Sequence, residues 1–229
     1  MSADALAQEG LDSRDPILKG SVQVVLGLVA KRRTTRGSSL QQLDPTLDIT
    51  IVEKHYCGFG ASGRNGGWAI GELAGSFGKY AKRSSPAGAL ALARAMFDTV
   101  DEMGRVIEAE GIDCGFAKGG TIRVARNTPQ AARQADEIAE KRSEGITEDQ
   151  VRLLDADEAR SMCNATNVHS GIFHTHSAAL QPARLVQGLA KSVEGRGVRI
   201  LEQTAVERIE PGKVVTNRGT ISARHVIRG

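Results

Sequence analysis

The stretch from Ile49 to Trp68 constrains the fold of this chain more than any other. It begins with an apolar run, Ile-Thr-Ile-Val, which is typical of a buried β-strand and which ends at the acid Glu53. Glycine has no Cβ and readily adopts positive φ, so a glycine-rich backbone can approach a bulky anion and turn its N–H groups toward it. Five glycines follow the acid in one loop: Gly58, Gly60, Gly63, Gly66 and Gly67.

Glu53 and Arg64 indicate which anion this loop suits. An acid at the end of the second strand of a βαβ unit is where nucleotide-binding folds hold a ribose, because a carboxylate accepts hydrogen bonds from its hydroxyls. Arg64 adds a cation beside the glycines, which suits phosphate oxygens. The alternative is a glycine-rich surface loop after an edge strand, but this order of acid and glycines favours the nucleotide site.

The same residues carry a family resemblance. Glu53-Lys54 followed by Cys57-Gly58-Phe59-Gly60-Ala61-Ser62-Gly63-Arg64-Asn65-Gly66-Gly67 resembles, without a gap, the FAD-dependent oxidoreductases of the D-amino-acid oxidase superfamily. The branch that it resembles most is the γ-glutamylputrescine oxidase-like amine oxidases. The resemblance implies an α/β fold, with part of a FAD-binding Rossmann-like domain (a doubly wound parallel sheet) and an inserted α+β substrate subdomain.

The resemblance also implies which residues contact FAD. Glu53 would hold the ribose, the loop would run along the diphosphate up to the isoalloxazine ring, and the backbone near Val206 would contact the adenine. No catalytic residue is assigned, because in this family the residues near the substrate come largely from a later part of the chain. The implied cofactor-binding residues are Gly27, Glu53, Ala61, Ser62, Gly63, Arg64, Asn65, Gly66, Gly67 and Val206.

The first glycine turn departs from the family pattern. Ser21–Leu26 predicts the first, central strand, and Gly27 stands for the first glycine, but Val29 and Arg32 occupy the second and third glycine positions. Those glycines let backbone meet pyrophosphate and let the helix pack on the strand. One interpretation is a diverged, basic loop that meets the diphosphate. The other is that residues 28–39 are read out of frame in the gene, which the DNA sequence would decide.

The domain order follows from the resemblance, which covers residues 21 to 227 and only the first half of a family member. We expect a disordered tail over 1–20, the first part of the FAD-binding domain over 21–68 with 28–39 aberrant, and a substrate-side α+β segment over 69–175. Residues 176–229 would return to the FAD-binding domain and end truncated.

The remaining residues predict a mixture of helices and strands, with no regular element between Trp68 and Ser85. Proline at a first helical position and glycine after a last turn mark the helices, and β-branched runs mark the strands. The predicted helices run from Ser85 to Gly111, from Thr128 to about Gly145, from a capping box at Asp155 and Glu158, and from Gln181 to Gly195. The predicted strands are a hairpin of Phe116–Lys118 and Thr121–Ala125, the single strands Gly171–Leu180, Val198–Glu202 and Ala205–Ile209, a hairpin over Lys213–Ile221, and His225–Ile227.

His174 and His176 are the only pair with a metal-ligand spacing. On one strand, alternation would put both imidazoles on the same face. No third ligand lies at a useful spacing, and a metal site needs at least three protein ligands. The pattern favours a structural pair or substrate-side residues, and no metal site is predicted.

Composition and charge exclude several classes of protein. The formal net charge is +3, and no basic stripe is interleaved with aromatic residues, so a nucleic-acid partner is not expected. Cys57, Cys114 and Cys163 form no CxxC pair, which argues against a disulfide framework or zinc and favours a reducing cytoplasm. The acidic first sixteen residues are not a secretory signal, and the apolar stretch Ile17–Ala30 is too short to span a bilayer, so no membrane association is expected.

Two functional hypotheses follow. The first is a FAD-dependent oxidoreductase that oxidises the C–N bond of a small-molecule amine or amino acid to an imine and passes the electrons to oxygen, as the resemblance implies. The second is a truncated or frame-disrupted, non-catalytic remnant that binds FAD poorly or not at all. In either case we expect this chain alone to be inactive, and flavin colour in the purified protein would separate the two hypotheses.

Overall fold

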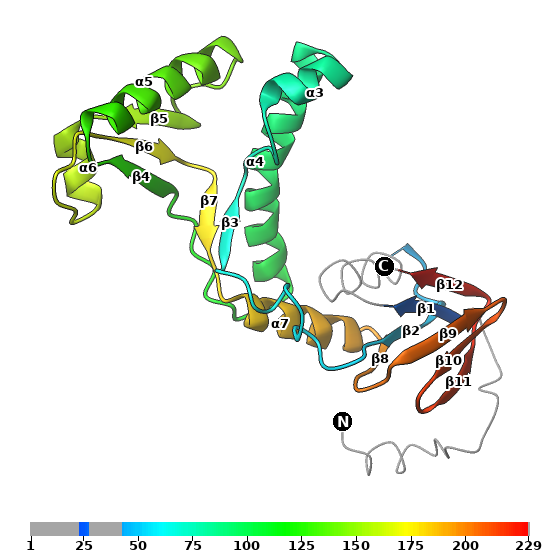
Figure 1. The fold of residues 1–229 in the computed structure, drawn as a ribbon. Coiled ribbons are helices and arrows are strands. Elements are labelled where there is room, and N and C mark those ends of the chain that lie inside the picture. The colour runs from blue at the N-terminus through cyan, green and yellow to red at the C-terminus, as the bar shows by residue number, and fades with distance from the viewer. Residues whose placement is uncertain (1–22, 28–42, 229) are drawn as a thin grey trace. The chain divides into compact units, whose positions relative to one another are not determined.

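The computed structural model describes residues 23–27 and 43–228, which form two compact units (Figure 1). Of the described residues, unit 1 contains 23–27, 43–66, 110–114 and 181–228, and unit 2 contains 67–109 and 115–180. The domain boundaries expected after residues 68 and 175 stay predictions, and they did not include the assignment of residues 110–114 to unit 1. The predicted tail over 1–20 and the aberrant segment 28–39 lie outside the described residues.

A four-stranded parallel sheet forms the centre of unit 1. Its strands are β1 (Gln23–Gly27), β2 (Asp48–Val52), β8 (Arg199–Leu201) and β12 (His225–Arg228), in the order β12-β1-β2-β8. Figure 1 shows β12, β1 and β2 side by side, with β1 between the other two. Parallel pairing throughout confirms the predicted α/β class and a partial Rossmann-like domain, since this strand order is the one that dinucleotide-binding folds use.

Both faces of this sheet are covered. On β2, Ile49 and Ile51 pack with Val186 and Val193 of helix α7 (Pro182–Glu194). The next residue, Val52, points to the opposite face and packs against the antiparallel sheet of β9 (Val206–Glu210), β10 (Lys213–Thr216) and β11 (Gly219–Ser222). A strand that is buried on both faces reads as a continuous apolar run, which is why the sequence identified β2.

Residues 110–114 belong to unit 1 because they are attached to α7. The Glu110 carboxylate accepts hydrogen bonds from Ser192 and Arg196, and these bonds lower the pKa of that carboxyl. Ile112 packs so closely on Gly188 that a Cβ there would lie 2.3 Å from its Cγ2. The Gln181 N–H donates to the carbonyl of Cys114 over 2.8 Å. Two distant parts of the chain are thereby joined within unit 1.

Unit 2 is built on an antiparallel sheet with the order β4-β6-β5. Its strands are β4 (Thr121–Ala125), β5 (Val151–Leu154) and β6 (Ser170–His174), and β3 (Trp68–Ile70) pairs separately with β7 (Ser177–Ala179). Its helices are α3 (Phe77–Arg83), α4 (Pro86–Ala109), α5 (Thr128–Ser143) and α6 (Ala156–Met162), and Figure 1 shows α5 running along the sheet.

Alternation along β6 places core residues on both faces of this sheet. Ile172 packs with Ala93 and Phe97 of α4, whereas Phe173 packs on the other side with Leu154 and Ala159. On the α5 side, Gln134 accepts a hydrogen bond from Ser170 Oγ and donates one to the carbonyl of Arg123. The buried side chains of Gln134 and Ser170 are therefore paired, as burial requires.

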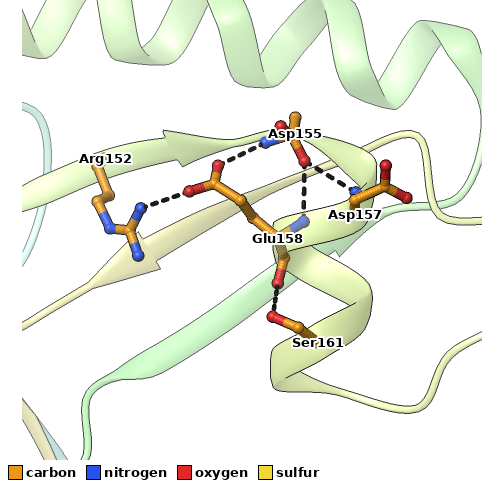
Figure 2. A network of polar contacts seen from close by, with 5 residues as sticks. All are labelled: Arg152, Asp155, Asp157, Glu158 and Ser161. Carbon is orange, nitrogen blue, oxygen red and sulfur yellow. Dashed lines mark hydrogen bonds and ion pairs between the residues drawn. The ribbon is translucent and has the colours of Figure 1, made fainter.

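Helix α6 begins with the predicted capping box (Figure 2). Asp155 Oδ1 accepts the N–H groups of Asp157 and Glu158, each over 2.8 Å, and Glu158 Oε2 accepts the Asp155 N–H over 3.1 Å. Arg152 donates to Glu158 Oε1 over 3.1 Å, and Ser161 Oγ donates to the backbone carbonyl of Glu158. These bonds satisfy N–H groups that a helix start otherwise leaves unpaired.

Two secondary-structure predictions were wrong in the middle of the chain. The stretch between Trp68 and Ser85, predicted to be irregular, contains β3 and α3. The sequence did not reveal them, because β3 is too short to show periodicity and α3 buries none of its residues. Residues 116–118 do not form a hairpin with β4. Instead β4 pairs with β6, and Ala117 forms a bridge with Ala179. Gly120, interpreted as a turn residue, has φ +74° and lies against Phe173, 2.4 Å from where its Cβ would be.

Two further details also differ from the predictions. The single strand predicted over Gly171–Leu180 is two strands, β6 and β7, interrupted at Thr175 and His176. The sequence favours Thr128 as the cap of the second helix, but the cap of α5 is Asn127, since Asn127 Oδ1 accepts the N–H of Gln130 over 2.9 Å. The other predicted helices and strands are confirmed to within a few residues. In the described part of the chain, no helix combines the length and apolarity needed to cross a bilayer.

The histidine pair packs around Phe97. His176 stacks on its ring with centroids 4.6 Å apart, and His174 meets it edge-on at 5.6 Å. His174 is only 3% exposed, and neither of its ring nitrogens has a hydrogen bond among the described residues. The Glu72 carboxylate lies 3.3 Å from Nε2, outside hydrogen-bonding geometry. Burial lowers the pKa of His174 to about 4, and the described residues hold no group of three or more metal-ligand side chains.

Buried His174 predicts acid sensitivity. Its pKa is lower in the folded chain than the ordinary 6.5, so the unfolded chain binds more protons as the pH falls from 6.5 toward 4. This group should therefore lower the free energy of unfolding across that window by up to about 3 kcal/mol. Urea unfolding at a series of pH values should show a shallower acid loss for His174→Phe than for the wild type. Exposed His169→Phe should leave the slope unchanged, and equal slopes for all three proteins would refute the assignment.

Candidate functional site

The ends of β1 and β2 meet at the carboxyl edge of the parallel sheet. Gly27 is the last residue of β1, and it pairs with Val52 on one side and Arg228 on the other. Glu53 follows Val52 directly, so the predicted residues Gly27 and Glu53 lie on neighbouring strand ends. The strand order reverses at β1, which has β2 and β8 on one side and β12 on the other. Open α/β sheets bind their ligands at such a point, outside the carboxyl ends of the strands.

Hydrogen bonds to the residue two positions later and to the turn after β8 fix the position of Glu53. Its N–H donates to the carbonyl of Leu201 over 2.9 Å, and its carbonyl accepts the N–H of Thr204 over 2.8 Å. Its side-chain Oε1 accepts the N–H of His55 over 3.0 Å. Glu53, predicted to bind the ribose, is therefore half-buried, and its carboxylate is oriented at the end of the strand.

The turn after β8 leads directly to Val206. Gln203 has φ +51°, and its N–H donates to the carbonyl of His55 over 2.7 Å. The Ala205 N–H donates to Asn217 Oδ1 over 2.8 Å, and β9 then begins at Val206. The Val206 side chain packs against the core around Val214. Val206, predicted to contact the adenine, therefore lies directly after the turn that is hydrogen-bonded to Glu53.

The glycine loop starts from a buried thiol. Cys57 is 7% exposed and packs in the core with Ile49, Ile51 and Val186, while its N–H donates to Glu202 Oε1 over 2.7 Å. Burial, followed by the neighbouring Glu202 carboxylate, raises the pKa of the Cys57 thiol to about 12. The thiol stays protonated, so Cys57 serves packing rather than nucleophilic chemistry.

The glycines of the loop divide into two kinds. Gly58 has φ +93°, and a Cβ on Gly63 would lie 2.1 Å from the Gly58 carbonyl oxygen, so these two let the loop close tightly on itself. Gly60 and Gly66 are exposed, with no described heavy atom within 4 Å of where a Cβ would be. Their outer side is open backbone that a bulky group can approach. Gly67, with φ +68°, is the first residue of unit 2, and its carbonyl accepts the N–H of Leu180.

Between these glycines lie the predicted phosphate-contacting residues. The Asn65 side-chain amide donates to the carbonyls of Ala61 and Ser62, over 3.2 and 3.0 Å, and so stabilises the turn itself. Ala61, Arg64 and Asn65 are exposed and Ser62 is half-buried. The Arg64 guanidinium lies 4.6 Å from the centroid of the Phe59 ring, a cation–π distance that leaves its charge exposed.

Sequence reasoning missed an aromatic group beside Arg64. The Phe59 ring lies tilted against His55, with centroids 4.1 Å apart, and meets Tyr56 edge-on at 5.2 Å; Tyr56 is 49% exposed. The available signal was three aromatic rings within five residues of a loop. Sequence reasoning also missed Glu202, although an acid directly after β8 repeats the position of Glu53 after β2.

The described residues at this edge fit an anionic nucleotide. They combine one oriented carboxylate at a strand end, exposed glycine backbone and an exposed guanidinium. Such groups bind and orient a ligand, since hydroxyls are matched by the carboxylate and phosphate oxygens by the cation and N–H groups. The arrangement is therefore suited to binding and orienting a ligand.

The close approach inside the loop predicts unequal tolerance of its glycines. Gly63→Ala would place a methyl group against the Gly58 backbone and should lower the free energy of unfolding by about 1–3 kcal/mol. Gly60→Ala, which meets open space in the same loop, should change it by roughly 0.5 kcal/mol or less. Urea unfolding of both variants checks the difference. Equal stability of the two variants would contradict this description of the loop.

Comparison with known proteins places the sequence in a family. The family model described as "FAD dependent oxidoreductase" (DAO) matches residues 39–228. γ-Glutamylputrescine oxidoreductase of Escherichia coli is 29% identical over 214 residues, which cover 92% of this chain and 49% of that protein. The probable oxidoreductase OrdL of Haemophilus influenzae is 27% identical over 197 residues, covering 83% and 44%. The chain thus spans about half the length of the curated relatives that it matches.

Solved structures resemble the fold as well. Glycine oxidase from Geobacillus kaustophilus superposes with a TM-score of 0.73 at 21% identity, covering 91% of this chain and 55% of that one. L-Amino acid deaminase from Proteus myxofaciens gives 0.72 at 18% identity, covering 94% and 46%. At these identities the likeness shows the fold, and the family is shown by the model that matches most of the sequence. The chain belongs to the DAO family of FAD-dependent oxidoreductases.

Proposed function

We propose that unit 1 holds FAD at the carboxyl edge of its parallel sheet. The observation that carries the proposal is the placement of Gly27 and Glu53 on adjacent strand ends where the strand order reverses, with the glycine loop following at once. Glu53 accepts hydrogen bonds from the ribose hydroxyls. The backbone from Ala61 to Gly66 lies along the diphosphate, aided by Ser62 and Arg64, and the backbone at Val206 supports the adenine.

Charge and exposure support this assignment of roles. A diphosphate is anionic, so it is attracted to an exposed guanidinium and to N–H groups that glycine leaves accessible. Arg64 and the glycines 60 and 66 are exposed in the loop, whereas Cys57, Gly58 and Gly63 are buried and give the loop its shape. A further role for Gly67, beside the flavin ring, stays a prediction from the resemblance.

We infer that the protein oxidises the C–N bond of an amine or amino acid to an imine and passes the electrons to oxygen. Support comes from the names of relatives, which include a γ-glutamylputrescine oxidoreductase, a glycine oxidase and an L-amino acid deaminase. The flavin, when bound, supplies the electron acceptor for this oxidation, and the chain's own residues bind and orient it. Unit 2 would contribute to the substrate side, and no catalytic residue is assigned to either unit.

A second candidate is a protein of the same fold that does not retain FAD. It is favoured by Val29 and Arg32, which stand where the family pattern has glycines. These two side chains would obstruct the approach of the backbone to a diphosphate without altering Glu53 or the glycine loop.

Titration with FAD tests the proposal. The purified chain should bind FAD and show flavin absorption near roughly 450 nm. Glu53→Gln keeps an oxygen for the His55 N–H but loses the charge that the ribose hydroxyls meet, so FAD affinity should fall about 10- to 100-fold. Glu207→Gln changes an exposed acid of the same unit and should bind like the wild type. Absence of binding by the wild type would favour the second candidate, and unchanged affinity of Glu53→Gln would remove Glu53 from the site.

A further inference from the structure

The Glu202 carboxylate links the end of β8 to the first residue of the glycine loop. Its Oε1 accepts the backbone N–H of Cys57 over 2.7 Å in a partly buried environment, across 145 residues of sequence. Glu202 directly follows β8, and Glu53 directly follows the neighbouring strand β2. Two acids thus leave adjacent strands at the same edge, one toward the predicted ribose position and one toward the loop.

Glu202 is itself held rigidly. On either side of it, the N–H of Glu53 donates to Leu201 and the N–H of Gln203 donates to His55, over 2.9 and 2.7 Å. Its own carbonyl accepts a hydrogen bond from Thr204 Oγ1 over 2.9 Å. These bonds fasten the turn after β8 to the turn after β2, so the carboxylate projects from a fixed backbone.

The loop receives its position from Cys57. The Cys57 side chain is buried in the core, and the next residue, Gly58, lies against Val186 of α7, which is 3.6 Å from where a Gly58 Cβ would be. Gly63 returns against the Gly58 backbone, and Arg64 follows. A displacement of the Cys57 backbone would therefore be passed to Gly63 and to Arg64.

Charge repulsion does not favour a carboxylate at this position. The Glu53 and Glu194 carboxylates, like that of Glu202, raise the pKa of the Cys57 thiol. Burial, followed by the Glu202 carboxylate, raises the pKa of Glu194. Among the described residues, no lysine or arginine forms an ion pair with Glu202. What compensates the burial of Glu202 is the hydrogen bond to the Cys57 N–H, because a charged acceptor forms a strong one.

We propose that Glu202 is a positioning residue that holds the glycine loop in the form that binds FAD, by accepting the Cys57 N–H. The inference rests on the proposed function of unit 1, since it deepens the account of that same site. Glu202 does not contact the cofactor in this scheme. It acts through Cys57 and Gly58 on the backbone that follows them.

The experiment uses the full chain with Glu202→Ala, Glu202→Gln and, as a matched control in the same unit, the exposed acid Glu207→Ala. Glutamine keeps an oxygen acceptor for the Cys57 N–H and removes the charge, whereas alanine removes both. The first readout is FAD affinity from flavin fluorescence. The second is the rate at which iodoacetamide alkylates Cys57 in the FAD-free chain, followed by mass spectrometry.

The expected results separate anchoring from charge. Glu202→Ala should weaken FAD binding about 10- to 100-fold, and Glu202→Gln should stay within about threefold of the wild type. Alkylation of Cys57 should be faster in Glu202→Ala than in Glu202→Gln. Both substitutions remove the negative charge that raises the pKa of the Cys57 thiol, so the excess rate in alanine over glutamine reports release of the loop rather than the change in thiol pKa. Glu207→Ala should match the wild type in both readouts.

Two results would overturn the inference. One is wild-type FAD affinity in Glu202→Ala, and the other is equal weakening in both Glu202 variants without release of Cys57. If the wild type binds no FAD, the proposed function fails, but the alkylation readout still decides whether Glu202 anchors the loop. Faster alkylation in Glu202→Ala than in Glu202→Gln would then support the anchor, and equal alkylation rates in the two variants would refute it.

Discussion

The parallel pairing of β2 with β1 and β8 is the interaction on which the site depends. Parallel strands end at one edge of a sheet, so Gly27, Glu53 and Glu202 emerge close together although their segments lie far apart in the sequence. The pairing is stabilised from both faces, by α7 against Ile49 and Ile51 and by the β9–β11 sheet against Val52. Loss of either cover would expose the strand that carries Glu53.

The glycine loop combines a buried half and an exposed half. Cys57, Gly58 and Gly63 lie in the interior and determine the path of the backbone, while Gly60, Arg64 and Gly66 lie on the surface. A methyl group at Gly63 would clash with the Gly58 backbone, and Gly58 has a positive φ that other residues rarely adopt, whereas Gly60 and Gly66 have open space beside them. A loop with this division can hold a shape and still present N–H groups and a cation to a ligand.

Prediction from the sequence succeeded where short-range pattern and tertiary environment agreed. The apolar run of β2, the capping box at Asp155 and Glu158, and the proline-initiated helices α4 and α7 were all identified. It failed where the partner was distant: β3 is three residues long and pairs with β7, and β4 pairs with β6 rather than with residues 116–118. Gly119 and Gly120 resembled a hairpin turn, but Gly120 is needed for close packing on Phe173.

The sequence alone determined the order of acid, glycines and arginine from Glu53 to Gly67, because those residues are contiguous and their chemistry needs no partner to be recognised. The sequence was likewise sufficient to identify the family. Only the tertiary structure decided that Gly27 lies beside Glu53, that Glu202 accepts the Cys57 N–H, and that Asn65 is used within the turn. The physical reason is that hydrogen bonds and packing depend on distance in space, and residues 145 apart in sequence become neighbours only when the sheet has formed.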